Sequence, residues 1–464
     1  MKNKLISKFI FLFSLIILVG FISQKIGLNI QQIIAISIFS ASVFATLLFW
    51  DFRVAIAFIG IGVLLITKTV DLENMIKFAS LEVILFLVGM MVLVGLIKEV
   101  GFFAWLVTLI LRIRNLTSKK FVFAISILSA ILACCVDEVT SIIFMAAAIL
   151  EICDYFEIEP TPFIIISILS TNIGSTGTVL GNPIGILIAT KSGLTFEDFI
   201  FKAFPLMFIC LLTTIFLVMF WYKKAMKKLD EKIKELGANE ILIKLISVPP
   251  ERQLKLGLGI FGLTLLFISL HHRLELLWNL EANTLLLSIP LISAGSVMIW
   301  KWKKARDYIE KDVDWWTLLF FLLLFAKAGT LKYTGATDVF AKKILTLVKH
   351  SPGMLIGTIL WMSAIGSSIL DNVVLVAAFI PIVQSFKDLG FVLQPLWWAL
   401  LFGGCMGGNI TLVGSTANIV ALGILEKEKN IRMTFFRWFW IGLTVGLITT
   451  AIVWIALLVL PMYH

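Results

Sequence analysis

Long apolar runs separated by short polar segments dominate the chain. A transmembrane helix needs about 20 apolar residues to cross the roughly 30 Å hydrocarbon layer of a bilayer. The first run follows a basic start, as in a signal peptide, but no A-x-A-like cleavage site follows it, so we interpret it as a span. The predicted spans are Lys8–Ser23, Gln31–Trp50, Val54–Val70, Leu81–Ile97, Phe204–Tyr222, Leu256–Leu270, Thr284–Trp300, Trp315–Leu331 and Trp438–Leu460.

Two further apolar stretches are interrupted by carboxylates. Phe121–Val136 leads into Asp137-Glu138, and Val139–Ile152 follows. An arm of this length is roughly 24 Å long and does not span comfortably. Carboxylates exposed to lipid at that depth would cost several kcal/mol. A re-entrant hairpin with Asp137 near its tip avoids both problems. The same pattern recurs in Met354–Leu370, Asp371-Asn372 and Val373–Val383.

Two glycine-rich segments predict helices that break near the middle of the membrane. After Pro162–Thr171, the segment Asn172–Gly185 holds four glycines and a proline. Glycine costs about 1 kcal/mol and proline about 3 kcal/mol in a helix interior. Gly403–Asn418 repeats this composition. One such run would be explained equally well by close helix packing. Two runs, each after a carboxylate-bearing hairpin, favour a midplane site in which backbone and side-chain oxygens hold a small cation.

The chain contains an internal repeat. An offset of 234 residues superposes Leu81–Gly101 on Trp315–Gly335 and Asp137 on Asp371. An offset of 233 then aligns the glycine-rich segments, with Thr178 on Thr411 and Gly181 on Gly414. Register held over this length indicates two equivalent halves. Because an odd number of crossings separates equivalent elements, the repeat must be inverted, as in secondary transporters.

These patterns predict an all-α membrane protein with about 11 transmembrane helices plus two re-entrant hairpins in a two-fold inverted repeat. We expect an extra N-terminal transmembrane helix at 1–30, a first repeat at 31–222, a cytoplasmic basic linker at 223–255 and a second repeat at 256–464. Phe102–Arg114 and Ala336–Lys349 mix apolar residues with cations, which predicts helices lying at the membrane interface.

Composition and charge agree with a multi-pass protein of the cell membrane. Hydrophobic residues make up 60% of the chain and charged residues 15%, with a mean hydropathy of +1.02. Soluble domains contain about 25% charged residues. The net charge of +10 is spread over short clusters between apolar runs, so no nucleic-acid partner is expected. Most of these cations fall on the inner side when the N-terminus is cytoplasmic and the C-terminus outside.

No catalytic or nucleotide-binding motif is present in the sequence. The five cysteines show no CxxC spacing, and HExxH, GxGD and GxxxxGK[ST] do not occur. We therefore expect neither an enzyme nor a cofactor other than bound Na+. Energy must come from an ion gradient or from a separate ATPase subunit.

Several polar residues in apolar surroundings have two interpretations. Asp137 and Asp371 are candidate ion ligands, or hairpin caps that satisfy backbone donors. Glu138 is a third candidate ligand, or it caps a helix or stays neutral. For Lys327, snorkelling or pairing with a carboxylate is favoured over a functional cation within the membrane. Cys134 and its neighbour Cys135 are expected to pack rather than to bind an oxyanion.

The motifs VDEVTS (136–141) with TNIGSTGTVLGNPIG (171–185), and LDNVV (370–374) with GGNITLVGSTAN (407–418), resemble a known group. They are similar to the arsenite permease and NhaD-type sodium/proton antiporter group of the ion-transporter superfamily, which has a citrate-transporter-like domain. The similarity is strongest to the pink-eyed dilution P-protein branch. It extends from about Leu81 to the C-terminus. The motifs are specific for the superfamily but not for the cargo.

The resemblance implies a carrier of eleven to twelve spans that is often a homodimer and moves its site by an elevator mechanism. It implies binding positions in both halves: Asp137, Asn172, Thr178, Gly181, Asn182, Asp371, Asn372, Asn409, Thr411, Gly414, Ser415 and Asn418. We assign Na+, if bound, to Asp137, Asn172, Asp371 and Asn409. The chain departs from the group at two places, with Asp137-Glu138 where Asp-Asn is usual and Gly181-Asn182-Pro183-Ile184-Gly185 where Gly-Asp-Pro-Pro-Asn is usual.

The leading functional hypothesis is a secondary active transporter that moves a small ion or oxyanion, such as arsenite, coupled to Na+ or H+ by alternating access. A Na+/H+ antiporter is the alternative, and an ion channel with the glycine-rich segments as its filter is a third reading. The predicted site contains carboxylates but no arginine. This favours handling of cations or protons over direct capture of a multiply charged anion.

Overall fold

The computed structural model describes residues 2–49, 52–111, 113, 115–236 and 252–463. All regular elements in these ranges are helices, and nine of them are long and apolar enough to cross a membrane, or up to ten if one bent pair counts as a single span. This confirms the predicted all-α membrane fold. Two of these nine, Ser118–Cys135 and Pro352–Ile369, are arms of the hairpins, so seven spans of the described residues lie outside the hairpins, or eight with the bent pair, against the expected 11. One reason is that the predicted span Val54–Val70 forms a 14-residue helix, Arg53–Ile66, which is only about 21 Å long.

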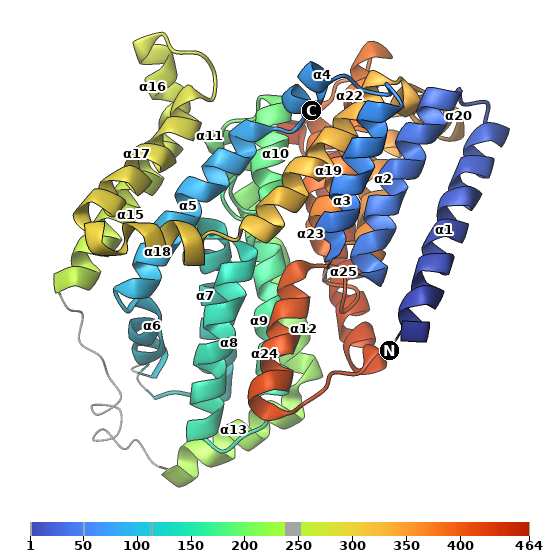
Figure 1. Cartoon of the computed structure of the whole chain (residues 1–464). Coiled ribbons are helices and arrows are strands. Elements are labelled where there is room, and N and C mark those ends of the chain that lie inside the picture. Colours follow the sequence, from blue (N-terminus) through green and yellow to red (C-terminus); the bar gives the residue numbers. More distant parts are fainter. Residues whose placement is uncertain (1, 50–51, 112, 114, 237–251, 464) are drawn as a thin grey trace.

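The helices form two groups, and each group takes elements from both repeats (Figure 1). We call the first group the scaffold, in which α5 packs on α17, and α19 packs on α2, α3 and α4. The scaffold consists of α1 (Lys2–Lys25), α2 (Ile30–Leu48), α3 (Arg53–Ile66), α4 (Leu72–Phe78), α5 (Leu81–Glu99), α6 (Phe102–Leu111), α15 (Arg252–Ser269), α16 (His271–Trp278), α17 (Thr284–Trp300), η3 (Trp302–Lys304), α18 (Ala305–Asp307), η4 (Tyr308–Asp312), α19 (Trp315–Tyr333) and α20 (Ala336–Leu347).

We call the second group the hairpin unit, in which α7 packs on α9 and α21 packs on α23. It consists of α7 (Ser118–Cys135), α8 (Glu138–Tyr155), α9 (Thr161–Gly174), α10 (Pro183–Ser192), α11 (Phe196–Asp198), η2 (Phe199–Ala203), α12 (Phe204–Trp221), α21 (Pro352–Ile369), α22 (Asn372–Asp388), α23 (Gln394–Gly407), α24 (Thr416–Lys429), α25 (Phe435–Val459) and η5 (Pro461–Tyr463). The short helices α6 and α20, predicted to lie at the interface, connect the scaffold to the two hairpins.

Both predicted hairpins are present and their tips point toward each other. Helices α7 and α8 meet at Val136-Asp137, and α21 and α22 meet at Leu370-Asp371. Figure 1 shows α8 and α24 in the lower half of the view and α10 and α22 in the upper half. Helix α8 packs against α24, and α10 against α22, so each hairpin lies beside the second half of the other repeat's broken helix. This is the arrangement expected of an inverted repeat.

Both glycine-rich segments interrupt their helices as predicted. Helix α9 ends at Gly174 and α10 begins at Pro183, and α23 ends at Gly407 before α24 begins at Thr416. The two glycines at the breaks are required by close packing. A Cβ atom on Gly174 would collide with the backbone of Ala130, and one on Gly407 with the backbone of Ala364. Each broken helix is therefore held directly against the first arm of its own hairpin.

The basic linker begins as a helix. Helix α13 (Lys223–Leu236) packs on α7, and its Asp230 accepts hydrogen bonds from the backbone and hydroxyl of Ser118, both at 2.7 Å. Residues 237–251 of the predicted linker lie outside the described residues. Figure 1 places α13 at one end of the molecule and the C-terminus at the other, with the N-terminus on the α13 side of the scaffold.

The expectation that Lys327 snorkels or pairs with a carboxylate is wrong for the described residues. Its side chain is fully buried in α19, and its ammonium group donates to the Ser42 hydroxyl at 2.5 Å. Helices α2 and α3 enclose this face of α19, and Gly60 of α3 lies against the end of the lysine side chain. The lysine therefore reaches neither water nor a headgroup, and its contacting partner is a neutral hydroxyl.

Candidate functional site

The two hairpin tips are joined through one carboxylate. The Asn372 amide donates to both carboxylate oxygens of Glu138, at 3.1 and 3.3 Å, and the Ser415 hydroxyl lies 3.4 Å from one of them. Glu138 is 2% exposed, and Asn372 and Ser415 are fully buried. Glu138 begins α8 and Asn372 begins α22, so both side chains project from the first turn of a helix at the tip of its hairpin. The partners of this buried carboxylate are thus neutral groups from the other repeat.

A cluster of amide side chains continues the contact between the repeats. The Asn172 amide donates to the side-chain oxygens of Asn409 and Asn418, both at 2.8 Å, and its own oxygen accepts from Ser415 at 3.1 Å. Asn418 in turn donates to the carbonyl oxygens of Gly408 and Thr411, at 2.8 and 2.9 Å. Asn172, Asn409 and Asn418 are fully buried. Asn172, at the broken end of α9, therefore ties the first repeat to the unwound segment of the second.

The aspartates at the tips act as helix caps. Asp137 accepts from the backbone of Val139 and Thr140, both at 2.8 Å. Asp371 accepts from the backbone of Val373 at 3.1 Å and from the hydroxyl of Thr416 at 2.5 Å. A carboxylate at this position satisfies backbone donors and is favoured by the helix dipole. The capping interpretation therefore holds for both residues. Asp137 caps through one of its two carboxylate oxygens, and Asp371 also contacts the polar side chain of Thr416.

Several contacts occur twice, once in each repeat. The Thr178 hydroxyl donates to the carbonyl oxygen of Cys134, and Thr411 donates to that of Ser368. Asn182 caps α10 through the Gly185 backbone at 2.9 Å, and Ser415 caps α24 through the Ala417 backbone at 3.2 Å. The threonine pair fixes each unwound segment to the first arm of its own hairpin, and the second pair caps the helix that follows the break. Gly181 and Gly414 also lie in these segments, where a Cβ would collide with the backbone of Ser175 and Gly408 respectively.

A cavity of about 280 Å³ reaches the first hairpin tip from the scaffold side. Its walls come from α5, α8, η4 and the start of α19, with Val373 and Thr416 at its inner end. Four carboxylates and two lysines line it: Asp137, Glu138, Asp312, Asp314, Lys98 and Lys311. The cavity extends from Glu138 to Lys98 and Lys311 on the scaffold, and the formal charge of its lining favours cations.

The sequence reasoning missed three charged residues that the scaffold brings to this region. Asp314 caps α19 through Thr317, whose backbone lies at 3.1 Å, and Asp312 lies 3.5 Å from Lys98. Arg53, at the start of α3, is buried and donates to the Thr317 hydroxyl at 3.3 Å. Asp371 and Asp314 both interact electrostatically with its guanidinium group. The premise that no arginine lies near the site is therefore incorrect. The sequence signal was available, because Arg53 and these aspartates directly precede apolar spans.

The structure brings six of the thirteen predicted site residues into one network of side-chain hydrogen bonds. Glu138, Asn172, Asn372, Asn409, Ser415 and Asn418 are linked by side-chain hydrogen bonds. Asn182 is turned away from them toward Ser175 and Cys405, at 2.9 and 3.1 Å. Among the described residues, no three His, Cys, Asp or Glu side chains are grouped as metal ligands. The assignment of Na+ to Asp137, Asn172, Asp371 and Asn409 stays a prediction.

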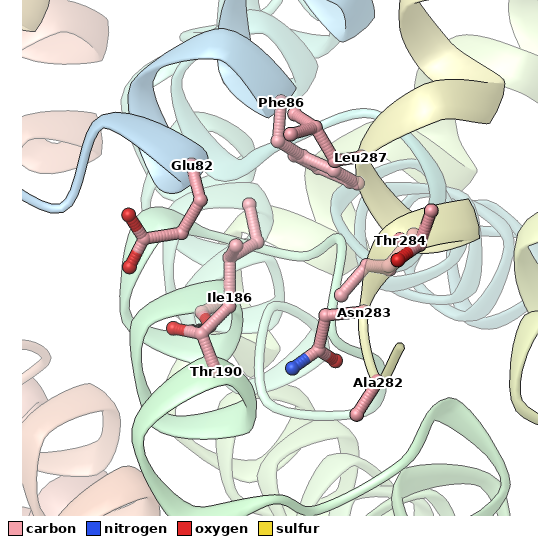
Figure 2. Close-up of a pocket in the computed structure, with 9 residues that line it drawn as sticks. Glu82, Phe86, Ile186, Thr190, Ala282, Asn283, Thr284 and Leu287 are labelled. Carbon is pink, nitrogen blue, oxygen red and sulfur yellow. Dashed lines mark hydrogen bonds between the residues drawn. The ribbon is translucent and has the colours of Figure 1, made fainter. Parts of the chain in front are cut away.

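A separate hollow of about 300 Å³ lies between α5, α10 and the start of α17 (Figure 2). None of the predicted site residues lines it. Phe86 and Glu82 of α5, Ile186 and Thr190 of α10, and the start of α17 line it. Figure 2 shows the Glu82 carboxylate projecting from α5 beside α10. Its partner is Lys191, whose ammonium group lies 3.0 Å away. This hollow marks a boundary between the scaffold and the hairpin unit.

A family model described as a citrate transporter matches residues 45–403, a range that includes both hairpins and the first broken helix. The chain belongs to the citrate transporter family. Among its relatives, an uncharacterized transporter of Mycobacterium tuberculosis is 30% identical over 359 residues, which cover 75% of this chain and 78% of that protein. The P protein of Homo sapiens is 25% identical over 442 residues, covering 80% of this chain and 52% of that protein.

The fold of this citrate transporter family member is also found in a solved structure. The YdaH transporter of Alcanivorax borkumensis superposes with a TM-score of 0.54 at 15% sequence identity, covering 84% of this chain and 88% of that one. The likeness concerns the fold alone. The family match and the relatives confirm the resemblance drawn from the hairpin and glycine-rich motifs, and the protein is a multi-pass membrane transporter rather than an enzyme.

Proposed function

We propose that this transporter is a secondary active carrier in which Glu138 binds the coupling ion, a proton or Na+, at the junction of the two repeats. The observation that carries the proposal is the contact of the buried Glu138 carboxylate with Asn372 and Ser415, without a cationic partner at hydrogen-bond distance among the described residues. A buried carboxylate whose hydrogen-bond partners are neutral, and which lies beside the carboxylates of Asp137 and Asp371, is costly when charged. Binding a proton or a cation removes that cost.

The surroundings of Glu138 can accommodate both states. Amide and hydroxyl donors from Asn372 and Ser415 stabilise the ionised carboxylate. When the carboxylate is neutralised, the amide cluster around Asn172 still has its own hydrogen bonds, since these groups satisfy one another. Binding of an ion to Glu138 thus changes the charge at the junction but leaves the hydrogen bonds of the amide cluster in place. This is the property required of a coupling site.

The cargo proposed is a small ion or oxyanion, with arsenite and citrate-like carboxylates as the classes to test. Membership of the citrate transporter family supports an anionic cargo. Arg53 near the second hairpin tip supports it as well, because guanidinium groups recognise carboxylates and oxyanions. A Na+/H+ antiporter is the second candidate. The four carboxylates around the site cavity favour it, since they attract cations.

The arrangement of the two groups supports alternating access by an elevator movement of the hairpin unit against the scaffold. The site cavity opens toward one side of the molecule. On the other side, two ion pairs join the groups: Lys191 with Glu82 at 3.0 Å, and Glu197 with Arg273 at 2.5 Å. Figure 1 shows α8, α9 and α24 extending below the ends of α5 and α15. A displacement of the hairpin unit along the membrane normal would exchange the open and closed sides.

The remaining expectations are part of the same proposal. We propose a cell-membrane protein with a cytoplasmic N-terminus and an external C-terminus, assembled as a homodimer. Bound Na+ is part of the proposal, and its energy source is an ion gradient or, as the alternative, a separate ATPase subunit. Epitope accessibility at the two termini in intact cells tests the orientation. Flux in proteoliposomes that contain only this chain tests the need for a further subunit.

The deciding experiment is flux into proteoliposomes under imposed pH and Na+ gradients, with labelled citrate, arsenite and Na+ as cargo. Glu138→Gln keeps the shape and the hydrogen-bonding groups of the side chain but removes its charge. Gradient-driven flux should be lost in this variant. Driven flux equal to that of the parent protein would refute the assignment of Glu138. Asp338→Asn, an acidic residue of the interface helix α20, is the control and should behave as the parent protein.

A further inference from the structure

We infer that the transporter has a second, basic vestibule on the C-terminal side of the molecule, which binds carboxylate or oxyanion ligands before they reach the midplane. The vestibule is a cavity of about 540 Å³ between α4, α5, α10, α19 and α22. Lys77, Lys191 and Lys332 line it from three different helices, and Glu82 is its one lining carboxylate among the described residues. It is distinct from the site cavity, with which it shares no lining residue.

The repeat relates this vestibule to the site cavity. The offset of 234 residues places Lys77 on Lys311 and Lys332 on Lys98, so the same pair of lysines frames both cavities. The aspartates of the site cavity have no counterpart in the vestibule. At the same offset, Asp312 corresponds to Phe78 and Asp314 to Ser80.

The two related cavities therefore carry opposite charge. In the site cavity, four carboxylates outnumber two lysines. In the vestibule, three lysines face one carboxylate, Glu82, which is already paired with Lys191 at 3.0 Å. Lys77 and Lys332 form no ion pair among the described residues. A cavity lined by one sign of charge and bounded by protein concentrates ions of the opposite sign.

The vestibule is large enough for a di- or tricarboxylate and continues toward solvent. A neighbouring hollow of about 700 Å³ shares Lys191, Lys332 and Gln384 with it. That hollow adds Lys387 together with the carboxylates of Asp198 and Asp388, so the basic character is confined to the vestibule itself. The inner end of the vestibule stops at Ala377, more than one helical turn beyond Asn372 at the hairpin tip. An anion bound here is therefore held close to the site but separated from it. Binding in the vestibule requires no translocation, so it can be measured apart from the proposed function.

The test measures the local potential at a cysteine placed in each cavity. Gln384→Cys reports on the vestibule and Thr140→Cys on the site cavity, each in the full chain in nanodiscs of zwitterionic lipid. The probes are an anionic (sulfonatoethyl) and a cationic (trimethylammonioethyl) methanethiosulfonate, and mass spectrometry quantifies modification at the introduced residue. The anionic reagent should react faster at position 384 and the cationic reagent faster at position 140. At each position the rate of the anionic reagent is divided by that of the cationic reagent. This ratio removes the effect of how accessible each cysteine is.

Repeat-matched variants then identify the lysines responsible. Lys77→Gln with Lys332→Gln should lower the anionic-to-cationic rate ratio at position 384 by about fivefold or more, as expected for removing two charges within a Debye length. Lys311→Gln with Lys98→Gln should leave that ratio unchanged. Citrate should slow the anionic reagent at position 384 more than sodium chloride of matched ionic strength does. A ratio that is insensitive to Lys77 and Lys332, or no protection by citrate, would overturn the inference.

Two further arms separate this inference from its alternatives. Nanodiscs with anionic phosphatidylglycerol test whether a lipid headgroup occupies the vestibule, and protection by that lipid but not by citrate would overturn the proposal of a soluble ligand. In Glu138→Gln, citrate protection at position 384 should persist. If Glu138→Gln also transports normally, the proposed coupling site fails while the vestibule stands. If protection disappears only in the lysine variants and transport still depends on Glu138, both proposals hold.

Discussion

The Asn372 amide lies 3.1 and 3.3 Å from the two carboxylate oxygens of Glu138, and these residues occupy the same position in the two repeats, 234 residues apart. The hairpin tips are thus equivalent in geometry but different in chemistry. At this position one tip has a carboxylate and the other has the neutral amide that donates to it. The asymmetry places one buried carboxylate at the junction in addition to the capping Asp137 and Asp371.

The amide of Asn172 should be a major contributor to stability. Asn172→Ala removes its hydrogen bonds to Asn409, Asn418 and Ser415 and leaves these buried groups without partners. Each unsatisfied buried group costs about 1–3 kcal/mol. We expect a clear fall in the thermal unfolding temperature in detergent. Gln24→Ala, at an exposed position of α1, should leave that temperature unchanged. Equal stability of the two variants would contradict the assigned role of the cluster.

The glycines at the two breaks should tolerate no side chain. Gly174→Ala and Gly407→Ala place a methyl group against the backbone of Ala130 and Ala364. Overpacking of this kind costs about 1–3 kcal/mol, and backbone cannot move aside as easily as a side chain. Both variants should show reduced yield and a lower unfolding temperature. Gly423→Ala, with open space around its Cβ, is the matched control and should be neutral or stabilising by about 0.5–1 kcal/mol.

The hairpins and the breaks could be predicted because their physical signals are local. A carboxylate between two short apolar arms, and glycines with proline in a span, each conflict with a straight lipid-facing helix. The repeat doubled both signals. It also predicted that Asp137 and Asp371 lie at equivalent tips, which the structure shows.

Contacts between distant helices could not be predicted in this way. Lys327 was interpreted from its own helix, but α2 and α3 enclose it and supply Ser42 as its partner. Arg53 and Asp314 stand just before the predicted spans Val54–Val70 and Trp315–Leu331, and the structure places both beside the second hairpin tip. A single sequence shows which positions of each helix are apolar, but it does not show which helices pack against one another. The identities of these partners therefore had to come from the structure.

Lys327 should be a cost to stability rather than a support. Its buried ammonium group has a neutral hydroxyl as its contacting partner. Burying a charge without a countercharge is unfavourable. Lys327→Met keeps the length of the side chain and removes the polar group, so we expect an equal or higher unfolding temperature. Lys327→Ala leaves a cavity and should lower the free energy of unfolding by an amount typical of core truncations, about 2–5 kcal/mol. A marked loss of stability in Lys327→Met would show that the ammonium group is needed.

Cross-linking should distinguish movement of the hairpin unit from a fixed structure. Glu82→Cys with Lys191→Cys joins the scaffold to the hairpin unit, because these residues form an ion pair across the boundary. A short bifunctional thiol reagent should then stop flux in proteoliposomes, and reduction should restore it. Asp154→Cys with Lys429→Cys joins two helices within the hairpin unit and is the matched control. Flux that continues across a complete Glu82–Lys191 cross-link would contradict the proposed motion.

The most direct test of the central claim compares two modes of transport in Glu138→Gln. In proteoliposomes, a pH or Na+ gradient drives net uptake only if the coupling ion binds, whereas exchange of internal for external cargo needs no gradient. The account predicts that Glu138→Gln loses gradient-driven uptake and its dependence on pH and Na+ but retains cargo exchange. Gradient-driven uptake with unchanged pH and Na+ dependence in this variant would contradict it.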